Sequence, residues 1–399
     1  MTAKTSILLL ALASAVATPA IHAQANPGAP RPAAQAAPAH APVAAHYAAL
    51  VHANYDDTLA AARTLQQAVA GFVQAPTPAT LDTARKAWLA AREFYGQTEA
   101  FRFYGGPIDN DRGPEGRLNA WPLDEAYVDA VQGQPNAGLV NDRKVAITAR
   151  SLAALNERGG EENIATGWHA IEFMLWGQDL YADGPGRRSA DDFVDGKAPN
   201  ADRRRRYLVT ITQLLVDDLG TLVKAWAPGV KGNYRAGFEK GGRESVRRML
   251  VGLGSLSRGE LAGERLEVAL NSQDQEDEHS CFSDNTHRDA ATNALGIQNV
   301  WLGRYRRADG TVLQGASLRE LVAAADPALA ERLTNQLAAS VAATAAIQAP
   351  FDREITGGRD APGRQRVQKA IDSLTQQSKD LVAAAAAIGI TRLTLVQPK

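Results

Sequence analysis

Apolar residues recur at helical spacing along most of this chain, and no other feature limits its fold so strongly. One continuous stripe comprises Tyr47, Leu50, Val51, Tyr55, Leu59, Ala62, Leu65 and Val69. A second stripe follows Pro76-Thr77-Pro78 and comprises Leu81, Ala84, Trp88, Ala91, Tyr95 and Thr98. Both patterns are typical of amphipathic helices. The short connection between them predicts an antiparallel pair.

Similar patterns predict further helices near 124–132, 139–157, 162–177, 202–226, 233–255, 258–272, 286–305, 317–346 and 364–388. No segment alternates with a period of two for long enough to indicate a strand. We therefore predict an all-α fold made of two domains that resemble four-helix bundles.

The segment from Asp183 to Asn200 is rich in Gly and Pro and is the best boundary between the two bundles. The expected N-terminal bundle covers residues 44–183 and the C-terminal bundle residues 200–399. Residues 165–177 and 293–303 share a weak pattern that ends in Trp176-Gly177 and in Trp301-Leu302-Gly303. An ancient duplication would explain this likeness.

The N-terminal residues are typical of an exported protein. An apolar run from Ile7 to Val16 and a small-residue site at Ala23-Gln24-Ala25 predict a signal peptide over residues 1–25. Residues 26–43 are rich in Ala and Pro and predict a disordered leader. Because no cysteine follows the cleavage site, we expect a periplasmic protein that is not a lipoprotein and has no membrane span.

The charge balance argues against nucleic acid as a partner. The chain has 43 basic and 44 acidic side chains, whereas phosphate binding needs a concentrated basic surface. The single basic cluster, Arg203–Arg206, is interpreted as the solvated first turn of a helix. Cys281 is the only cysteine, so no intrachain disulfide can form.

His169 and Glu172 are the first candidates for a metal site. Their spacing of three places both on one face of a helix, a turn apart. An imidazole nitrogen and a carboxylate oxygen suit zinc or iron. The alternative is a buried histidine that forms a hydrogen bond with a carboxylate in a plain core. Two ligands do not complete a site, so other parts of the chain would have to contribute.

The segment from Glu276 to Asp289 is dense in possible ligands. It contains His279, Asp284 and His287, but helix capping in a solvated acidic loop explains part of this composition. Glu99, near the end of an apolar helix face, is a further candidate. A buried glutamate needs a partner, which could be Arg92 or Arg102 in an ion pair or a metal shared with His169 and Glu172.

Gly167-x-His169-x-x-Glu172, followed by Trp176-Gly177-Gln178-Asp179, resembles the imelysin family, also known as the M75 peptidase group. Thr98–Phe103, Gly106–Asp109, Trp121–Asp124 and Cys281–His287 also resemble family segments. The resemblance implies two helical bundles and an envelope location. It also implies two competing functions, a surface peptidase with the motif His and Glu as metal ligands, or an iron-regulated protein of periplasmic iron uptake.

We therefore expect a periplasmic metal-binding protein that serves iron uptake or homeostasis, with iron favoured over zinc and with an envelope iron-uptake protein as a possible partner. The expected ligands are His169 and Glu172 together with members of the set Glu99, His279, Asp284 and His287. The alternatives are a zinc-dependent metallopeptidase and a non-catalytic interaction module of the envelope. No zincin sequence, nucleotide-binding loop or haem attachment site is present.

Overall fold

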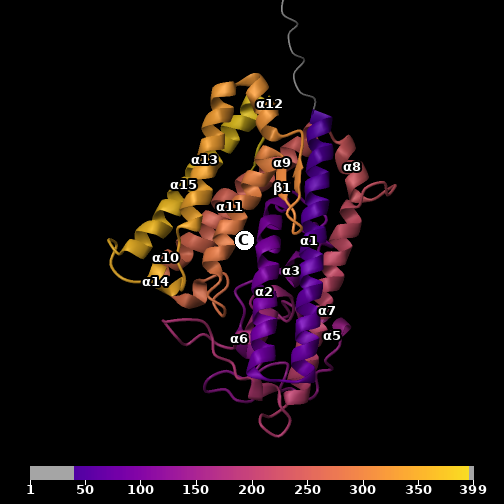
Figure 1. Ribbon diagram of the computed structural model, residues 1–399, viewed down its shortest axis with the longest axis vertical. Helices are drawn as coiled ribbons and strands as arrows, with labels where there is room; N and C mark the ends of the chain where they lie inside the picture. Colours follow the sequence, from indigo (N-terminus) through magenta and orange to yellow (C-terminus); the bar gives the residue numbers. More distant parts are fainter. Residues whose placement is uncertain (1–39, 395–399) are drawn as a thin grey trace, which may run out of the picture. The chain divides into compact units, whose positions relative to one another are not determined.

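A computed structural model describes residues 40–394, and its two longest N-terminal helices lie side by side (Figure 1). Helix α1 spans His40–Gln74 and α2 spans Pro78–Thr98. Thr77 caps α2 through a capping box with Thr80, and Pro78 occupies the first turn, where its missing N–H costs nothing. The predicted signal peptide lies outside the described residues. The predicted leader is described only at its end, where α1 begins at His40.

The remaining elements follow in chain order. They are η1 (Glu99–Phe101), α3 (Glu115–Leu118), α4 (Glu125–Val128), α5 (Ala149–Leu155), α6 (Gly167–Trp176), η2 (Ala190–Phe193), α7 (Ala201–Trp226), α8 (Tyr234–Lys240), α9 (Arg243–Ser255), η3 (Leu256–Glu267), α10 (Val268–Ser272), η4 (Gln275–Asp277), α11 (Thr286–Leu302), β1 (Arg304–Arg306), β2 (Val312–Gln314), α12 (Leu318–Ala325), α13 (Pro327–Ala345), α14 (Asp352–Ile355) and α15 (Pro362–Ala387). The all-α prediction is confirmed.

Helices α1, α2, α6 and α7 form one packed set. α1 lies against both α2 and α7, and α6 packs on α2 and α7. Trp88 on α2 meets Trp168 and Trp176 on α6 edge to face, at ring distances of 6.4 and 5.4 Å. These large buried rings fix the position of α6, the helix that carries His169 and Glu172.

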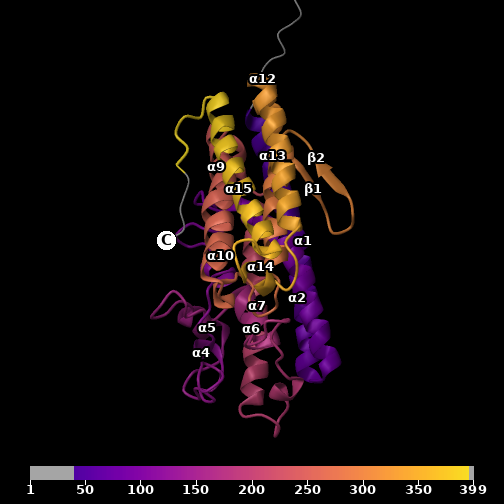
Figure 2. The ribbon, with the colours of Figure 1, turned by 90° about the vertical axis from the view of Figure 1, so that its left-hand side faces the viewer.

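Helices α11, α13 and α15 form a second set together with the continuous α9–η3–α10 segment. Figure 2 shows α13 and α15 of this set side by side. The middle part of that segment, η3, is π-helical. α11 also packs on α2 and so joins the two sets. Their crossing is close at Gly96, where an added Cβ would lie 2.0 Å from Oγ1 of Thr292. Only glycine fits at this contact.

Several predicted helix bounds were wrong. Within 139–157 only Ala149–Leu155 is helical, and within 124–132 only Glu125–Val128. The predicted helix over 317–346 is divided at Asp326, whose side chain caps α13. The chain also contains a short hairpin, β1–β2, in which Tyr305 pairs with Leu313. Its strands of three residues are too short to produce an alternating pattern in the sequence.

The interpretation of Arg203–Arg206 as a solvated turn was wrong for its first two residues. Arg204 is buried and forms two hydrogen bonds with Asp129, Nε to Oδ2 at 2.6 Å and Nη2 to Oδ1 at 2.9 Å. Arg203 donates to four backbone carbonyls of residues 139–145. Both side chains therefore anchor a long irregular segment onto α7.

None of the described helices is both long and apolar enough to cross a membrane. The described residues all belong to one compact unit. α7, which follows the predicted boundary, packs on α1 of the N-terminal part. The division into two bundle domains, and their origin by duplication, stay predictions.

Candidate metal centre

Gly167 starts helix α6 in a conformation that other residues rarely adopt. Its φ is +90°, and an added Cβ would lie 2.6 Å from the carbonyl oxygen of Leu118 and 2.7 Å from that of Arg117. Both the positive φ and the close backbone require glycine. This explains physically why the motif starts with glycine two residues before His169.

His169 and Glu172 form a buried pair on α6. Nδ1 of His169 lies 2.8 Å from Oε2 of Glu172. The other oxygen, Oε1, accepts hydrogen bonds from the backbone N–H and the hydroxyl of Ser283, at 2.9 and 2.6 Å. Both oxygens of Glu172 are therefore occupied, whereas Nε2 of His169 has no hydrogen-bond partner among the described residues.

Burial controls the protonation of this pair. It raises the pKa of Glu172 to about 8, although the hydrogen bond from Ser283 acts in the opposite direction. Burial, together with the positive charge of Arg92, lowers the pKa of His169 to about 3. At neutral pH, Glu172 therefore keeps its proton and His169 is a neutral imidazole, the form that binds metals. Metal binding at Nε2 of His169 would release one proton from this pair.

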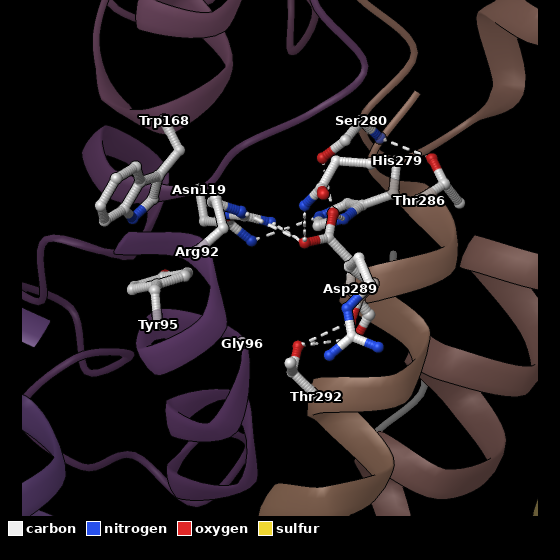
Figure 3. A network of polar contacts seen from close by, with 12 residues as sticks. Arg92, Tyr95, Gly96, Asn119, Trp168, His279, Ser280, Thr286, Asp289 and Thr292 are labelled. Carbon is white, nitrogen blue, oxygen red and sulfur yellow. Dashed lines mark hydrogen bonds and ion pairs between the residues drawn. The ribbon is translucent and has the colours of Figure 1, made fainter. Parts of the chain in front are cut away.

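His279 is held by a network that reaches α2 and α11 (Figure 3). Nδ1 of His279 lies 2.7 Å from Oδ2 of Asp289. The same carboxylate forms an ion pair with Arg92 at 2.9 Å and accepts a hydrogen bond from Ser280. Arg92 also donates to Oδ1 of Asn119 at 2.6 Å, which leaves Nδ2 of Asn119 facing Nε2 of His279 at 3.3 Å.

This network assigns the tautomer of His279. Because Nδ2 of Asn119 is a donor, Nε2 of His279 accepts, and the proton of the ring lies on Nδ1 toward Asp289. Burial lowers the pKa of His279 well below its usual value, with Arg265 acting in the same direction. The lone pair at Nε2 of His279 therefore accepts the hydrogen bond from Asn119, and a metal ion bound at Nε2 would replace this contact.

The two imidazole rings meet edge to face with their centroids 4.7 Å apart. Both histidines line one cavity of about 330 Å³. Its walls also carry the acidic side chains Asp124, Glu125, Glu162, Glu276, Asp277 and Glu278. Burial, with the nearby charge of Glu276, raises the pKa of Glu125 to about 7. The cavity therefore combines nitrogen donors with an acidic wall.

Each histidine thus has its Nδ1 beside a carboxyl group, Glu172 or Asp289. Histidines that bind metals are usually held in this way, because the carboxylate fixes the ring and increases the basicity of the other nitrogen. The arrangement can bind a metal through Nε2. Glu172 orients the ring of His169, and Asp289 orients the ring of His279 in the same way.

The structure places the other predicted residues in three different surroundings. Glu99 forms ion pairs with Arg102 at 2.6 Å and Arg265 at 2.7 Å. Although burial opposes them, these two arginines lower the pKa of Glu99 to about 2. Within the described residues, His287 forms no hydrogen bond with the side chain of His169 or Glu172. Its Nδ1 contacts the backbone oxygen of Asp284. Asp284 itself lies with Asp179 and Asp352.

The sequence analysis missed Asp289 and Asn119 as parts of the site. Asp289 is ten positions from His279, a spacing that no helix face brings together, and Asn119 belongs to a distant irregular segment. The only local indication of Asp289 was Arg92 on α2, because an arginine on an apolar helix face needs a carboxylate partner. Arg92 was considered as a partner of Glu99, but it pairs with Asp289.

Comparisons with known proteins show what this chain is similar to. The sequence model of the family described as Imelysin matches residues 51–381. Iron-regulated protein A of Synechococcus elongatus is 28% identical over 333 residues, which cover 82% of this chain and 83% of that protein.

Two solved structures share the fold. An iron-regulated protein A precursor from Parabacteroides distasonis has a TM-score of 0.67 and 19% identity over 89% of this chain and 97% of its own. An imelysin-like protein from Psychrobacter arcticum has a TM-score of 0.62 and 16% identity over 89% and 98%.

Proposed function

The chain belongs to the imelysin family, and on this basis we propose that it is an iron-related protein of the cell envelope that binds a metal ion at His169 and His279. The Nε2 atoms of these residues are the proposed nitrogen ligands. Glu172 and Asp289 orient the rings, and acidic side chains of the cavity wall such as Glu125 and Glu276 supply oxygen ligands, directly or through water.

One observation carries this proposal. Two histidines from distant segments each have Nδ1 held by a buried carboxylate, and both line the same acidic cavity. A buried Nε2 without a partner is costly in a protein core, and a bound ion would satisfy it. A plain core histidine would not need a second histidine and an acidic cavity beside it.

Iron is the favoured ion for two reasons. A relative that matches most of this chain is named for its regulation by iron. In addition, imidazole suits iron, zinc and copper, whereas an acidic wall favours the harder ions among them. Zinc is the alternative.

Reversible binding fits the geometry better than hydrolysis. A catalytic zinc centre uses three protein ligands and a bound water. Among residues 40–394, the only group of three such donors close enough to share an ion is Asp179, Asp284 and Asp352, and it contains neither histidine. Glu172, the motif glutamate, is also engaged by Ser283 and His169 and is not free to act as a base.

The test is elemental analysis of the purified protein after incubation with iron(II), iron(III) or zinc, beside the variants His169→Ala and His279→Ala. We expect roughly stoichiometric metal in the wild type and loss of it in both variants. His52→Ala is the matched control, because His52 lies on α1 and does not line the cavity. It should bind metal as the wild type does.

The other outcomes separate the alternatives. Cleavage of a peptide library that depends on zinc and on Glu172 would support a metallopeptidase. Absence of metal from the folded wild type would refute the proposal and leave an interaction module of the envelope.

A further inference from the structure

Three aspartates from separate segments meet in the interior. Asp179 follows α6, Asp284 precedes α11 and Asp352 is the first residue of α14. One carboxylate oxygen from each lies within 4.8 Å of the others. Their side chains are buried, with relative exposures of 2%, 5% and 5%. Like charges this close and this buried are unfavourable unless something neutralises them.

No basic side chain of the described residues neutralises this cluster. None of the ion pairs within residues 40–394 involves these aspartates. Among the described residues, Oδ2 of Asp179, Oδ1 of Asp284 and both oxygens of Asp352 also have no hydrogen-bond donor other than the carboxyl groups of the cluster itself. The contrast with Asp129 and Asp289 is clear, because each of those buried carboxylates forms an ion pair with an arginine.

Glu278 is a fourth buried carboxyl group in this part of the interior. Glu278 is 2% exposed, and among the described residues its carboxyl oxygens have no partner other than the carboxyl group of Asp352. The side-chain charges that act on it most strongly are those of Asp352, Asp284 and Asp179. Glu278 is therefore a close neighbour of the three aspartates.

We propose that Asp179, Glu278, Asp284 and Asp352 form a second cation site, distinct from the histidine pair, that binds a hard divalent cation of the size of Ca²⁺. All candidate ligands are oxygens, which calcium, magnesium and manganese prefer. Oxygens on opposite sides of Ca²⁺ are about 4.6–5.2 Å apart, since each bond is about 2.3–2.6 Å. Magnesium needs shorter bonds and retains its waters, so it fits a cluster of four protein carboxylates less well.

The proposed cation would fix the position of the histidine site's own loop. Glu278 and Asp284 enclose His279 and Ser283, the residues that meet His169 and Glu172. Asp352 would link α14, in the C-terminal part of the chain, to the same cation. The site thus ties three segments together, and its existence does not depend on the identity of the ion at the histidines.

The test is a calcium titration of the mature protein after treatment with chelator, at pH 7.5, with calorimetry and thermal unfolding as readouts. We expect one equivalent of Ca²⁺ to bind and to raise the melting temperature. Asp352→Asn should lower the affinity at least about tenfold, as loss of a group that shapes a metal site does. The same change should raise the melting temperature of the cation-free protein, because it removes an ionisable group from a crowded cluster of buried carboxyl groups.

The controls separate this proposal from the proposed iron site. Asp360→Asn changes an exposed aspartate of the same region and should bind Ca²⁺ like the wild type. The double variant His169→Ala, His279→Ala should keep its calcium affinity. Asp179→Asn is the second variant if Asp352→Asn does not fold.

Three results would overturn the proposal. If Ca²⁺ leaves the wild type unchanged, the carboxyl groups share protons and hold no cation. If both aspartate variants bind like the wild type, the ion lies elsewhere. If the histidine double variant loses calcium, there is one site and not two.

Discussion

The imidazole rings of His169 and His279 lie edge to face with centroids 4.7 Å apart, although they come from different parts of the chain. Each ring has Nδ1 beside a buried carboxylate, Glu172 for the first and Asp289 for the second. The two histidines therefore have the same kind of support at Nδ1, and both line the same cavity.

Replacement of Gly167 by alanine should prevent the correct start of α6. The φ of +90° disfavours alanine by about 1–2 kcal/mol, and the clash with the carbonyls of Arg117 and Leu118 adds to this cost. We expect a loss of more than about 2 kcal/mol in the free energy of unfolding, measured by urea denaturation.

Gly71→Ala is the matched control for that change. Gly71 lies in α1, and an added Cβ meets nothing within 4 Å. This variant should gain about 0.5–1 kcal/mol, because alanine is the better helix former. Equal stability of the two variants would mean that the start of α6 is not constrained as described.

Asp289→Asn should affect both stability and metal binding. It leaves the buried guanidinium of Arg92 without its ion pair, a change that typically costs about 3–5 kcal/mol. It also removes the carboxylate that holds Nδ1 of His279, so metal affinity should fall about 10–100-fold. Denaturation and metal titration, with Asp360→Asn as control, measure the two effects. Unchanged metal affinity in folded Asp289→Asn protein would argue against His279 as a ligand.

Glu99→Gln should affect stability alone. The buried carboxylate of Glu99 neutralises Arg265 and Arg102, but Arg265 keeps a second ion pair with Glu260. We expect a moderate loss of about 1–3 kcal/mol together with full metal uptake. Loss of metal from the folded variant would restore Glu99 as a ligand, the role predicted from the sequence.

Asp129 makes the stability of the protein sensitive to acid. Burial raises the pKa of Asp129, but Arg188 and Arg204 outweigh this effect and lower it below its usual value. A carboxyl group with a lowered pKa stabilises the fold above its unfolded pKa, and this contribution disappears as the pH falls through the folded value. The stabilisation should therefore be present at neutral pH and decrease below about pH 4.

Asp129→Asn tests this dependence directly. Loss of the charge leaves the buried Arg204 without an ion pair and Arg188 with only its longer contact of 3.8 Å to Asp192, so we expect a cost of about 3–5 kcal/mol at pH 7. The difference from the wild type should shrink as the pH is lowered toward 3. Urea denaturation at several pH values measures it, and a difference that does not depend on pH would contradict the assigned role.

The sequence by itself determined the helices and the local part of the site. Helical periodicity predicted α1, α2 and α7, because burial of one face repeats every three to four residues. The spacing of three also brought His169 and Glu172 together, since neighbouring turns of one helix place such residues side by side. The family resemblance drawn from these motifs is confirmed.

Only the tertiary structure decided which distant groups meet. It joined His279 to His169, paired Glu99 with Arg265 and Arg92 with Asp289, and buried Arg204 against Asp129. Helical geometry fixes contacts within a few residues, whereas contacts between segments depend on how buried surfaces pack and on which charges must be neutralised in the interior. The spacing of residues along the sequence does not predict these contacts between distant segments.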